Sequence, residues 1–267
     1  MVVVAILALL MGILLPALAS SRTEGTKIKC LANLHVVGQA FAAYSIDDER
    51  SFTSPIHPKA EQTWWYDGEY EYGGKTGVGI YAHQDFVQEN RILNRYLVGA
   101  NGGSICGLFE CPSDQGVPDA PYDFDDYFLG PLLRGRATHI ATGTSYRLNN
   151  HIDFTSNLDP QFGTHFYGPY MRPTSQVPDP GTTVLLEEAI AEVAKWNEMS
   201  YRTLGWHRKM NVFNVLFADA HAGAIQLQGQ PPVEARYADY WVFRGEGWRM
   251  DCYPLQPICD KPRRCDP

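Results

Sequence analysis

The sequence predicts an α+β fold in which a long N-terminal α-helix packs on an antiparallel β-sheet that carries large loop insertions. Residues 2–47 begin with an uncharged apolar run and continue with apolar residues every three to four positions, which is typical of a helix. The second half contains short apolar runs bounded by turn residues, which is typical of strands. The 24 Gly and 18 Pro of this 267-residue chain indicate many turns and loops.

The predicted helix has two halves of different character. Residues 2–19, VVVAILALLMGILLPALA, span about 27 Å, which is close to the hydrocarbon thickness of a bilayer. Pro16 is expected to bend this half, because it removes one backbone hydrogen bond. In residues 20–47, one apolar face is predicted from Ile28, Leu31, Leu34, Val37 or Gly38, Phe41, Ala42 and Tyr44.

A cleaved signal peptide and a transmembrane anchor are the alternative interpretations of the apolar run. Ala17-Leu18-Ala19 resembles a cleavage site, but no basic residue precedes the run. The amphipathic continuation does not resemble the start of a mature chain, so it favours one retained helix over residues 2–47.

The predicted sheet comes from the second half of the chain. Strands are expected at 144–149 (TSYRLN) and 182–187 (TTVLLE), followed by a final hairpin of 211–217 and 222–227. Upstream of them, residues 83–97 are predicted to form a short helix. The segment FECPSD, residues 109–114, is predicted to form a short strand that leads into a turn.

Charge and motifs narrow the function classes. The net charge of −8 and the absence of a Lys/Arg cluster argue against a nucleic-acid partner. An enzymatic interpretation rests on His207, Asp219, His221 and Glu187, because two His and a carboxylate can form a metal shell. No H-E-x-x-H, G-x-S-x-G or P-loop motif accompanies them. We therefore favour structural roles, in which Asp219 caps the hairpin turn and His207 packs beneath it.

An acidic loop, DAPYDFDDYF, spans residues 119–128. Asp123, Asp125 and Asp126 offer closely spaced oxygen ligands of the kind that bind Ca²⁺. The loop lacks the Gly turn and the distal Glu of an EF-hand, so a solvated acidic loop is favoured. We expect no cofactor, and Ca²⁺ is the weak alternative.

Several segments together resemble a known family. The matching residues are Leu14-Leu15-Pro16-Ala17-Leu18, Arg22, Lys29-Cys30-Leu31, Asn33-Leu34, Gly38-Gln39-Ala40, Tyr44 and Asp47, followed by CPSD at 111–114, TSYRLN at 144–149 and NVLFADAH at 214–221. This combination is similar to type IV pilin-like proteins and type II secretion pseudopilins, especially the large bacterial group with CPSD and H-x9-D-G signatures. The chain departs from that pattern in the turn, where Ala220 replaces a Gly that suits positive φ. The interval from His207 to Asp219 is also longer than in the signature.

The resemblance implies a structural subunit, not an enzyme, that polymerises through its N-terminal helix into an extracellular or periplasmic filament. Its partners would be copies of itself, the inner membrane before assembly, and the pilus or type II secretion machinery. A minor pseudopilin of a type II secretion system is the alternative within this class, and a secreted or membrane-anchored metal-dependent hydrolase is the alternative outside it. The assembly surface would comprise Val2, Leu7, Leu10, Leu14, Pro16 and Leu18.

The resemblance also divides the chain into an assembly helix at 1–50, a globular head at 51–227 and an aromatic, Cys/Pro-rich extension at 228–267. The extension is expected to cover the subunit or to contact a neighbouring one. In the resembled family the mature chain normally begins further upstream, with a Phe and then a Glu in the apolar run, and neither is present here. We therefore expect that Met1 is not the native start; the alternative is that assembly proceeds without that Glu.

The six cysteines are an even set that suits an oxidising compartment. They are Cys30, Cys106, Cys111, Cys252, Cys259 and Cys265. Cys30 and Cys111 occupy places typical of the resembled family, and a bridge between them would tie the helix to the sheet with about 4 kcal/mol of stabilisation. Cys106 with Cys111 is the rival pairing. The spacing lacks Cys-x-x-Cys and leaves the connectivity open.

Overall fold

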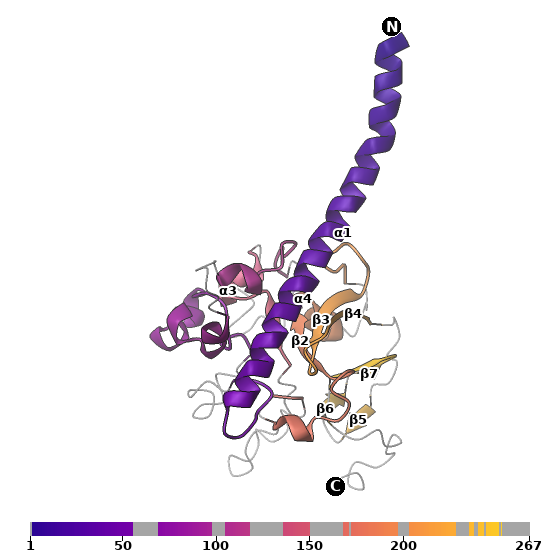
Figure 1. Ribbon diagram of the computed structural model, residues 1–267. Coiled ribbons are helices and arrows are strands. Elements are labelled where there is room, and N and C mark those ends of the chain that lie inside the picture. The colour runs from indigo at the N-terminus through magenta and orange to yellow at the C-terminus, as the bar shows by residue number, and fades with distance from the viewer. Residues whose placement is uncertain are drawn as a thin grey trace.

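A computed structural model describes residues 2–55, 69–97, 105–117, 136–149, 168–170, 172–196, 203–227, 235–237, 240–242, 244–250 and 252. A four-stranded antiparallel sheet is built from β1 (Tyr146–Leu148), β2 (Val184–Glu188), β3 (Val212–Phe217) and β4 (Ala222–Gln226), in that order across the sheet. The helix α1 (Val2–Asp47) lies along the sheet and extends far beyond it (Figure 1). These elements confirm the α+β fold class and the final hairpin predicted from the sequence.

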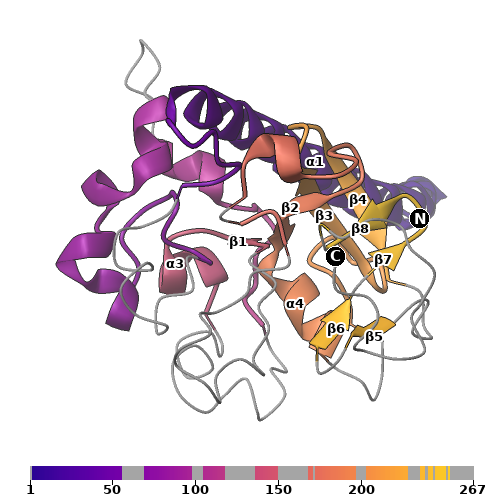
Figure 2. The ribbon, with the colours of Figure 1, turned by 90° about the horizontal axis from the view of Figure 1, so that it is seen from below.

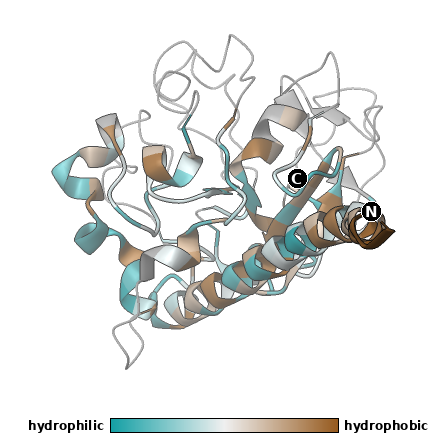
Figure 3. Cartoon of the chain, turned by 90° about the horizontal axis from the view of Figure 1, so that it is seen from above, coloured by the Kyte–Doolittle hydropathy of each residue, from teal (hydrophilic) through white to brown (hydrophobic). Residues whose placement is uncertain are grey.

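The helix α1 has the bounds that the sequence predicts, and Pro16 lies inside it. Its C-terminal half contacts β3, β4 and the single-turn 3-10 helices described below. The buried residues are Cys30, Asn33, Leu34, Val37, Gly38, Ala40, Phe41 and Tyr44. The predicted apolar face is therefore correct at its centre but wrong at its edges: Ile28 and Ala42 are exposed, and Cys30 takes the place of Ile28 against the head. Figure 3 shows the apolar N-terminal half continuing away from the head.

Short elements surround this frame. They are η1 (Gly79–Ala82), η2 (Gln84–Phe86), η3 (Gln88–Asn90), η4 (Ile92–Tyr96), η5 (Ile105–Phe109), α3 (Thr138–Thr142), η7 (Thr174–Gln176), α4 (Ala189–Trp196), and the two-stranded pairs β5 (Ala235–Tyr237) with β6 (Tyr240–Val242) and β7 (Arg244–Gly245) with β8 (Trp248–Arg249). Figure 2 shows the early 3-10 turns on one flank of the sheet and β5 to β8 on the other.

The helix predicted at 83–97 is wrong in type: the segment forms three separate 3-10 turns. Val87 and Arg91 adopt extended backbone between the turns, which interrupts a continuous helix. The buried guanidinium of Arg91 donates hydrogen bonds to the carbonyls of Phe86, Tyr70, Gly73 and Thr142. Only the Phe86 carbonyl belongs to the segment itself, so distant parts of the head supply most of the partners that this buried cation requires.

The segment at 109–114 also differs from the prediction. Its first residue, Phe109, ends the 3-10 helix η5 and belongs to no strand. The predicted turn is present, because the Asp114 amide donates to the carbonyl of Cys111 at 3.0 Å.

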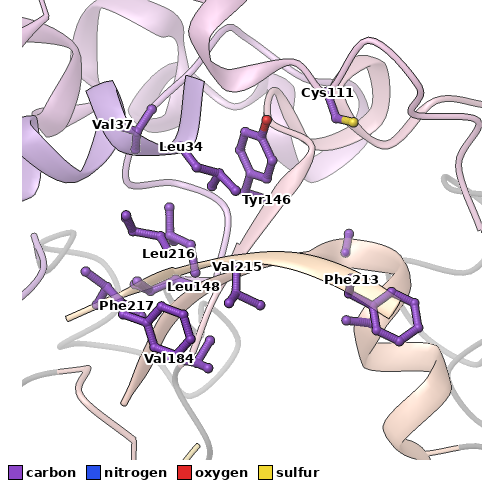
Figure 4. Close-up of a cluster of buried hydrophobic side chains, with 14 of the residues drawn as sticks. Leu34, Val37, Cys111, Tyr146, Leu148, Val184, Phe213, Val215, Leu216 and Phe217 are labelled. Carbon is purple, nitrogen blue, oxygen red and sulfur yellow. The ribbon is translucent and has the colours of Figure 1, made fainter. Parts of the chain in front are cut away.

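The core lies between α1 and the sheet. Leu34 and Val37 from the helix meet Leu216 and Tyr146 from the strands (Figure 4). The β-hairpin turn also touches the helix, and its Ala220 adopts a φ of +70°. Trp248 and Met250, from the range expected to form a covering extension, are buried in the same core.

Candidate functional site

Four side chains with metal-ligating atoms meet in the core beneath α1. Cys30 comes from α1, Cys111 from the turn after η5, Glu188 from the end of β2, and His207 from the loop before β3. All four residues are buried, with exposed fractions between 0 and 4%. Their ligand atoms all lie within 4.8 Å of one another. The cluster therefore joins the helix to three separate parts of the head.

One carboxylate oxygen, Glu188 Oε1, lies at the centre of this cluster. It is 2.9 Å from His207 Nε2, 3.2 Å from Cys30 Sγ and 3.8 Å from Cys111 Sγ. Cys111 Sγ is 3.5 Å from His207 Nε2. The Tyr146 hydroxyl approaches Cys30 Sγ at 3.3 Å.

Strand alternation directs Glu188 toward the cluster. Successive side chains on a strand point to opposite faces, so the adjacent Glu187 faces the other way and pairs with Arg147 at 3.5 Å. The second oxygen of Glu188, Oε2, accepts a hydrogen bond from the backbone amide of Asn214 at 3.1 Å. Strand β3 thus fixes the orientation of the carboxylate from the neighbouring strand.

Tight loop geometry holds His207. The Gly205 amide donates to the Lys209 carbonyl at 3.0 Å, and Arg208 adopts a φ of +58°. On the preceding residue, the Trp206 indole donates to the Gly116 carbonyl at 2.9 Å. The loop is therefore anchored on both sides of the imidazole.

A second network positions Cys111. Its amide donates to Ser145 Oγ at 2.9 Å, and this hydroxyl donates to Asp114 Oδ2 at 2.7 Å. Asp114 also accepts hydrogen bonds from the amides of Thr138 and His139. Burial raises the pKa of the Asp114 carboxyl, but the hydrogen bonds from His139 and Ser145 outweigh it, so the pKa lies below its usual value.

The four groups of the cluster shift one another's pKa values in different directions. Burial raises the pKa of Cys30, but hydrogen bonds from Cys111, His207 and Tyr146 lower it by a larger amount, so the pKa is about 5. Burial lowers the pKa of His207, while its contacts with Cys30 and Glu188 raise it to about 9. Burial raises the pKa of Glu188 to about 7. The hydrogen bond to Cys30 raises the pKa of Cys111, because that bond favours the Cys111 thiol.

The hydrolase set considered from the sequence does not assemble around His207. Asp219 and His221 form their own pair at the β3–β4 turn, with 2.6 Å between Oδ1 and Nδ1. Both side chains are more than 40% exposed, whereas His207 is buried beside Glu188. The Asp219 carboxylate also accepts from the His221 amide, consistent with the predicted cap of the turn.

Several other predicted sites lie outside the described residues. They are Asp123, Asp125 and Asp126 of the acidic loop, the side chain of Cys106, and Cys259 and Cys265 of the tail. Cys252 is described and is buried. The sulfur atoms of Cys30 and Cys111 are neighbours, and no disulfide joins them.

The N-terminal half of α1 is the second notable feature. By length and composition, this helix is able to cross a membrane, and none of its most apolar 18-residue stretch is buried against the rest of the described chain. Every predicted assembly residue lies in this half. The first packed position is near Thr26, whose Oγ1 accepts from Ser113 Oγ at 3.0 Å.

Fold and site together define an α+β protein with one long, half-exposed apolar helix and a buried cluster of two Cys, one His and one Glu. Comparisons with protein-family models, characterised proteins and solved structures give no match for this chain.

Proposed function

We propose that the chain is a pilin-like structural subunit that polymerises through residues 2–19 into a filament outside the cytoplasm. The observation that carries this proposal is the N-terminal half of α1, which is apolar on every side and has no partner among the described residues. A helix that is hydrophobic all round belongs in a membrane or among other helices.

The size of this apolar surface argues that it is always covered in the cell. Twelve large apolar side chains in this half are between 51 and 73% exposed: Val2, Val3, Val4, Ile6, Leu7, Leu9, Leu10, Met11, Ile13, Leu14, Leu15 and Leu18. Burying one such side chain completely stabilises by about 1.5–3 kcal/mol. Covering the whole set therefore contributes on the order of 10 kcal/mol relative to exposure to water, so lipid or other helices must cover this surface.

The continuity of α1 supports polymerisation over simple anchoring. A membrane anchor needs no fixed angle to its domain, and a flexible linker serves it well. Here one unbroken helix runs from Val2 to Asp47, and its second half is packed in the core of the head. Helices that bundle through their first halves would hold the heads in a defined repeat, as a filament requires.

The same helix would serve at two stages. Before assembly, residues 2–19 would hold the subunit in the inner membrane, where all backbone groups of a helix are satisfied internally. After assembly, the helices would bury each other in the filament core. A short periplasmic pseudopilus of a type II secretion system is the alternative within this proposal. The proposal gives the chain a structural role and no catalytic one.

Deletion of residues 2–19 tests the proposal. We expect the full chain to fractionate with membranes and with sheared surface filaments, and the truncated chain to be found as a soluble monomer. The matched control replaces residues 2–19 with an unrelated apolar transmembrane helix. This control should restore membrane binding but not filaments. Filaments from the truncated chain, or from the control, would contradict the proposal.

A further inference from the structure

We propose that Cys30, Cys111, Glu188 and His207 bind one Zn²⁺ in a closed tetrahedral site that clamps α1 to the head. The inference stands apart from the polymerisation proposal, because it concerns only the described core. It assigns a metal to a cluster that no motif in the sequence indicates.

The distances between the ligand atoms agree with a zinc tetrahedron. With Zn–S bonds of about 2.3 Å and Zn–N or Zn–O bonds of about 2.0–2.1 Å, neighbouring ligand atoms lie about 3.4–3.8 Å apart. Four of the separations are 2.9, 3.2, 3.5 and 3.8 Å, and every remaining pair lies within 4.8 Å. A shift of about half an ångström per side chain would therefore admit the ion.

The ligand types select zinc. Thiolates exclude Mg²⁺ and Ca²⁺, which prefer oxygen, and the mixture of two thiolates, one imidazole and one carboxylate matches known zinc ligands. Four protein ligands fill a tetrahedral shell, and the burial of all four leaves no open position for a substrate. These are the properties of a structural zinc site, not of a catalytic one.

Groups around the four ligands hold them in orientation, as outer-shell residues do at metal sites. The Asn214 amide holds Glu188 Oε2, so Oε1 is directed at the cluster. The Tyr146 hydroxyl lies 3.3 Å from Cys30 Sγ and can donate a hydrogen bond to the thiolate. Outer-shell groups of this kind fix ligand orientation and tune affinity.

One ion pair, between His207 and Glu188 at 2.9 Å, accounts for only two of the four clustered groups. Buried ionisable groups are costly unless they are paired or coordinate a metal. Without an ion, two thiols, an imidazole and a carboxylate share one small volume, and Glu188 Oε1 is the acceptor for three of the contacts. A divalent cation would replace these competing contacts with four bonds to one centre.

The location of the site suggests what the metal does. Cys30 is the first fully buried residue of α1 and lies in the second, packed half of the helix. Cys30 and Glu188 are 158 residues apart in sequence, so the ion would join distant segments that are adjacent only in the folded head. Because such a site is absent from the unfolded chain, metal binding stabilises the fold. The ion would fix the direction in which the helix leaves the head.

The test measures metal in the full-length chain purified in detergent without chelators. We expect about one zinc per chain by elemental analysis. X-ray absorption of this wild-type protein should show two sulfur ligands at about 2.3 Å and two nitrogen or oxygen ligands at about 2.0–2.1 Å. Replacing the zinc with Co²⁺ should give the visible absorption of a tetrahedral thiolate site. Because these measurements use the wild-type chain, they remain decisive if a variant does not fold.

Variants then assign the ligands. Cys30→Ser and His207→Ala should each lose at least nine-tenths of the bound zinc. The controls are Cys252→Ser, at another buried cysteine, and His221→Ala, at the exposed histidine of the turn; both should retain it. Three results would each overturn the proposal: a metal-free chain with reduced thiols, a Cys30–Cys111 disulfide in the native protein, or zinc retained in both ligand variants.

Discussion

The two halves of α1 share one backbone but differ in what covers them. Leu10 in the first half is 51% exposed, whereas Leu34 in the second half is 0% exposed. Tertiary packing within the described residues therefore stabilises only the second half of the helix. The difference indicates that the first half is shaped for a partner outside the subunit.

Truncating one leucine in each half of α1 should give the largest difference in the free energy of unfolding. Leu34→Ala removes a fully buried side chain and should lower the free energy of unfolding of the head by about 2–5 kcal/mol. Leu10→Ala should change it by less than about 0.5 kcal/mol, because Leu10 does not pack on the head. Denaturant unfolding in detergent, followed by Trp fluorescence, measures both. Equal losses in the free energy of unfolding would contradict the difference in packing between the two halves.

Matched glycine substitutions sharpen the same contrast. A Cβ on Gly38 would lie 2.7 Å from Leu216 Cδ1 and 3.0 Å from the Ala220 carbonyl oxygen, whereas one on Gly12 would meet nothing within 4 Å. Gly38→Ala should therefore destabilise the head by about 1–3 kcal/mol through overpacking. Gly12→Ala should leave the head unchanged and favour the local helix by up to about 1 kcal/mol. Thermal unfolding and far-UV circular dichroism distinguish these effects. A neutral Gly38→Ala would show that the helix does not approach the hairpin this closely.

The stability that the buried Asp114 carboxylate gives to the head should depend on pH. Its folded pKa lies below the unfolded value of about 3.8, so its contribution is present above that pH and is lost as the pH falls through the folded pKa. Asp114→Asn should cost about 1–3 kcal/mol at pH 7, because it removes the charge from five hydrogen bonds. Urea midpoints of both proteins should converge as the pH is lowered below about 3.8. A difference in urea midpoint between the two proteins that stays the same at every pH would contradict the role of the charge.

The smallest expected effect concerns the turn that contacts the packed half. Ala220 has a φ of +70°, which is unfavourable for any residue with a Cβ. Ala220→Gly should stabilise the head by about 0.5–1 kcal/mol. His221→Ala, at the neighbouring exposed position, provides a control for general disturbance of the turn. Destabilisation by the glycine would mean that the Ala220 methyl group contributes more through packing than its backbone costs.

Local patterns in the sequence predicted the regular elements well. The apolar run and its repeat predicted both ends of α1, and TSYRLN and the final hairpin predicted strands of the sheet. These predictions succeed because helix and strand periodicities are local properties of the chain. The segment 83–97 failed because the buried Arg91 side chain recruits distant carbonyls, which periodicity does not record.

The four-residue cluster could not be predicted in the same way. Its ligands come from four distant segments without Cys-x-x-Cys spacing, so only the tertiary fold brings them together. Residue types alone indicated Glu187 and His207 but grouped them with the exposed pair at the hairpin turn. Glu188, one residue further along the strand, is the carboxylate that faces the cysteines.

Site-specific photo-crosslinking tests the central claim, that the exposed half of α1 contacts other copies of the chain. A photoreactive residue would replace Leu10, at 51% exposure, and in a separate variant Leu204, a leucine of the head at 54% exposure. Illumination of intact cells that assemble the protein should give a ladder of subunit oligomers from position 10 and only monomer from position 204. Crosslinks from position 10 to lipid alone, with no subunit oligomers, would contradict the account.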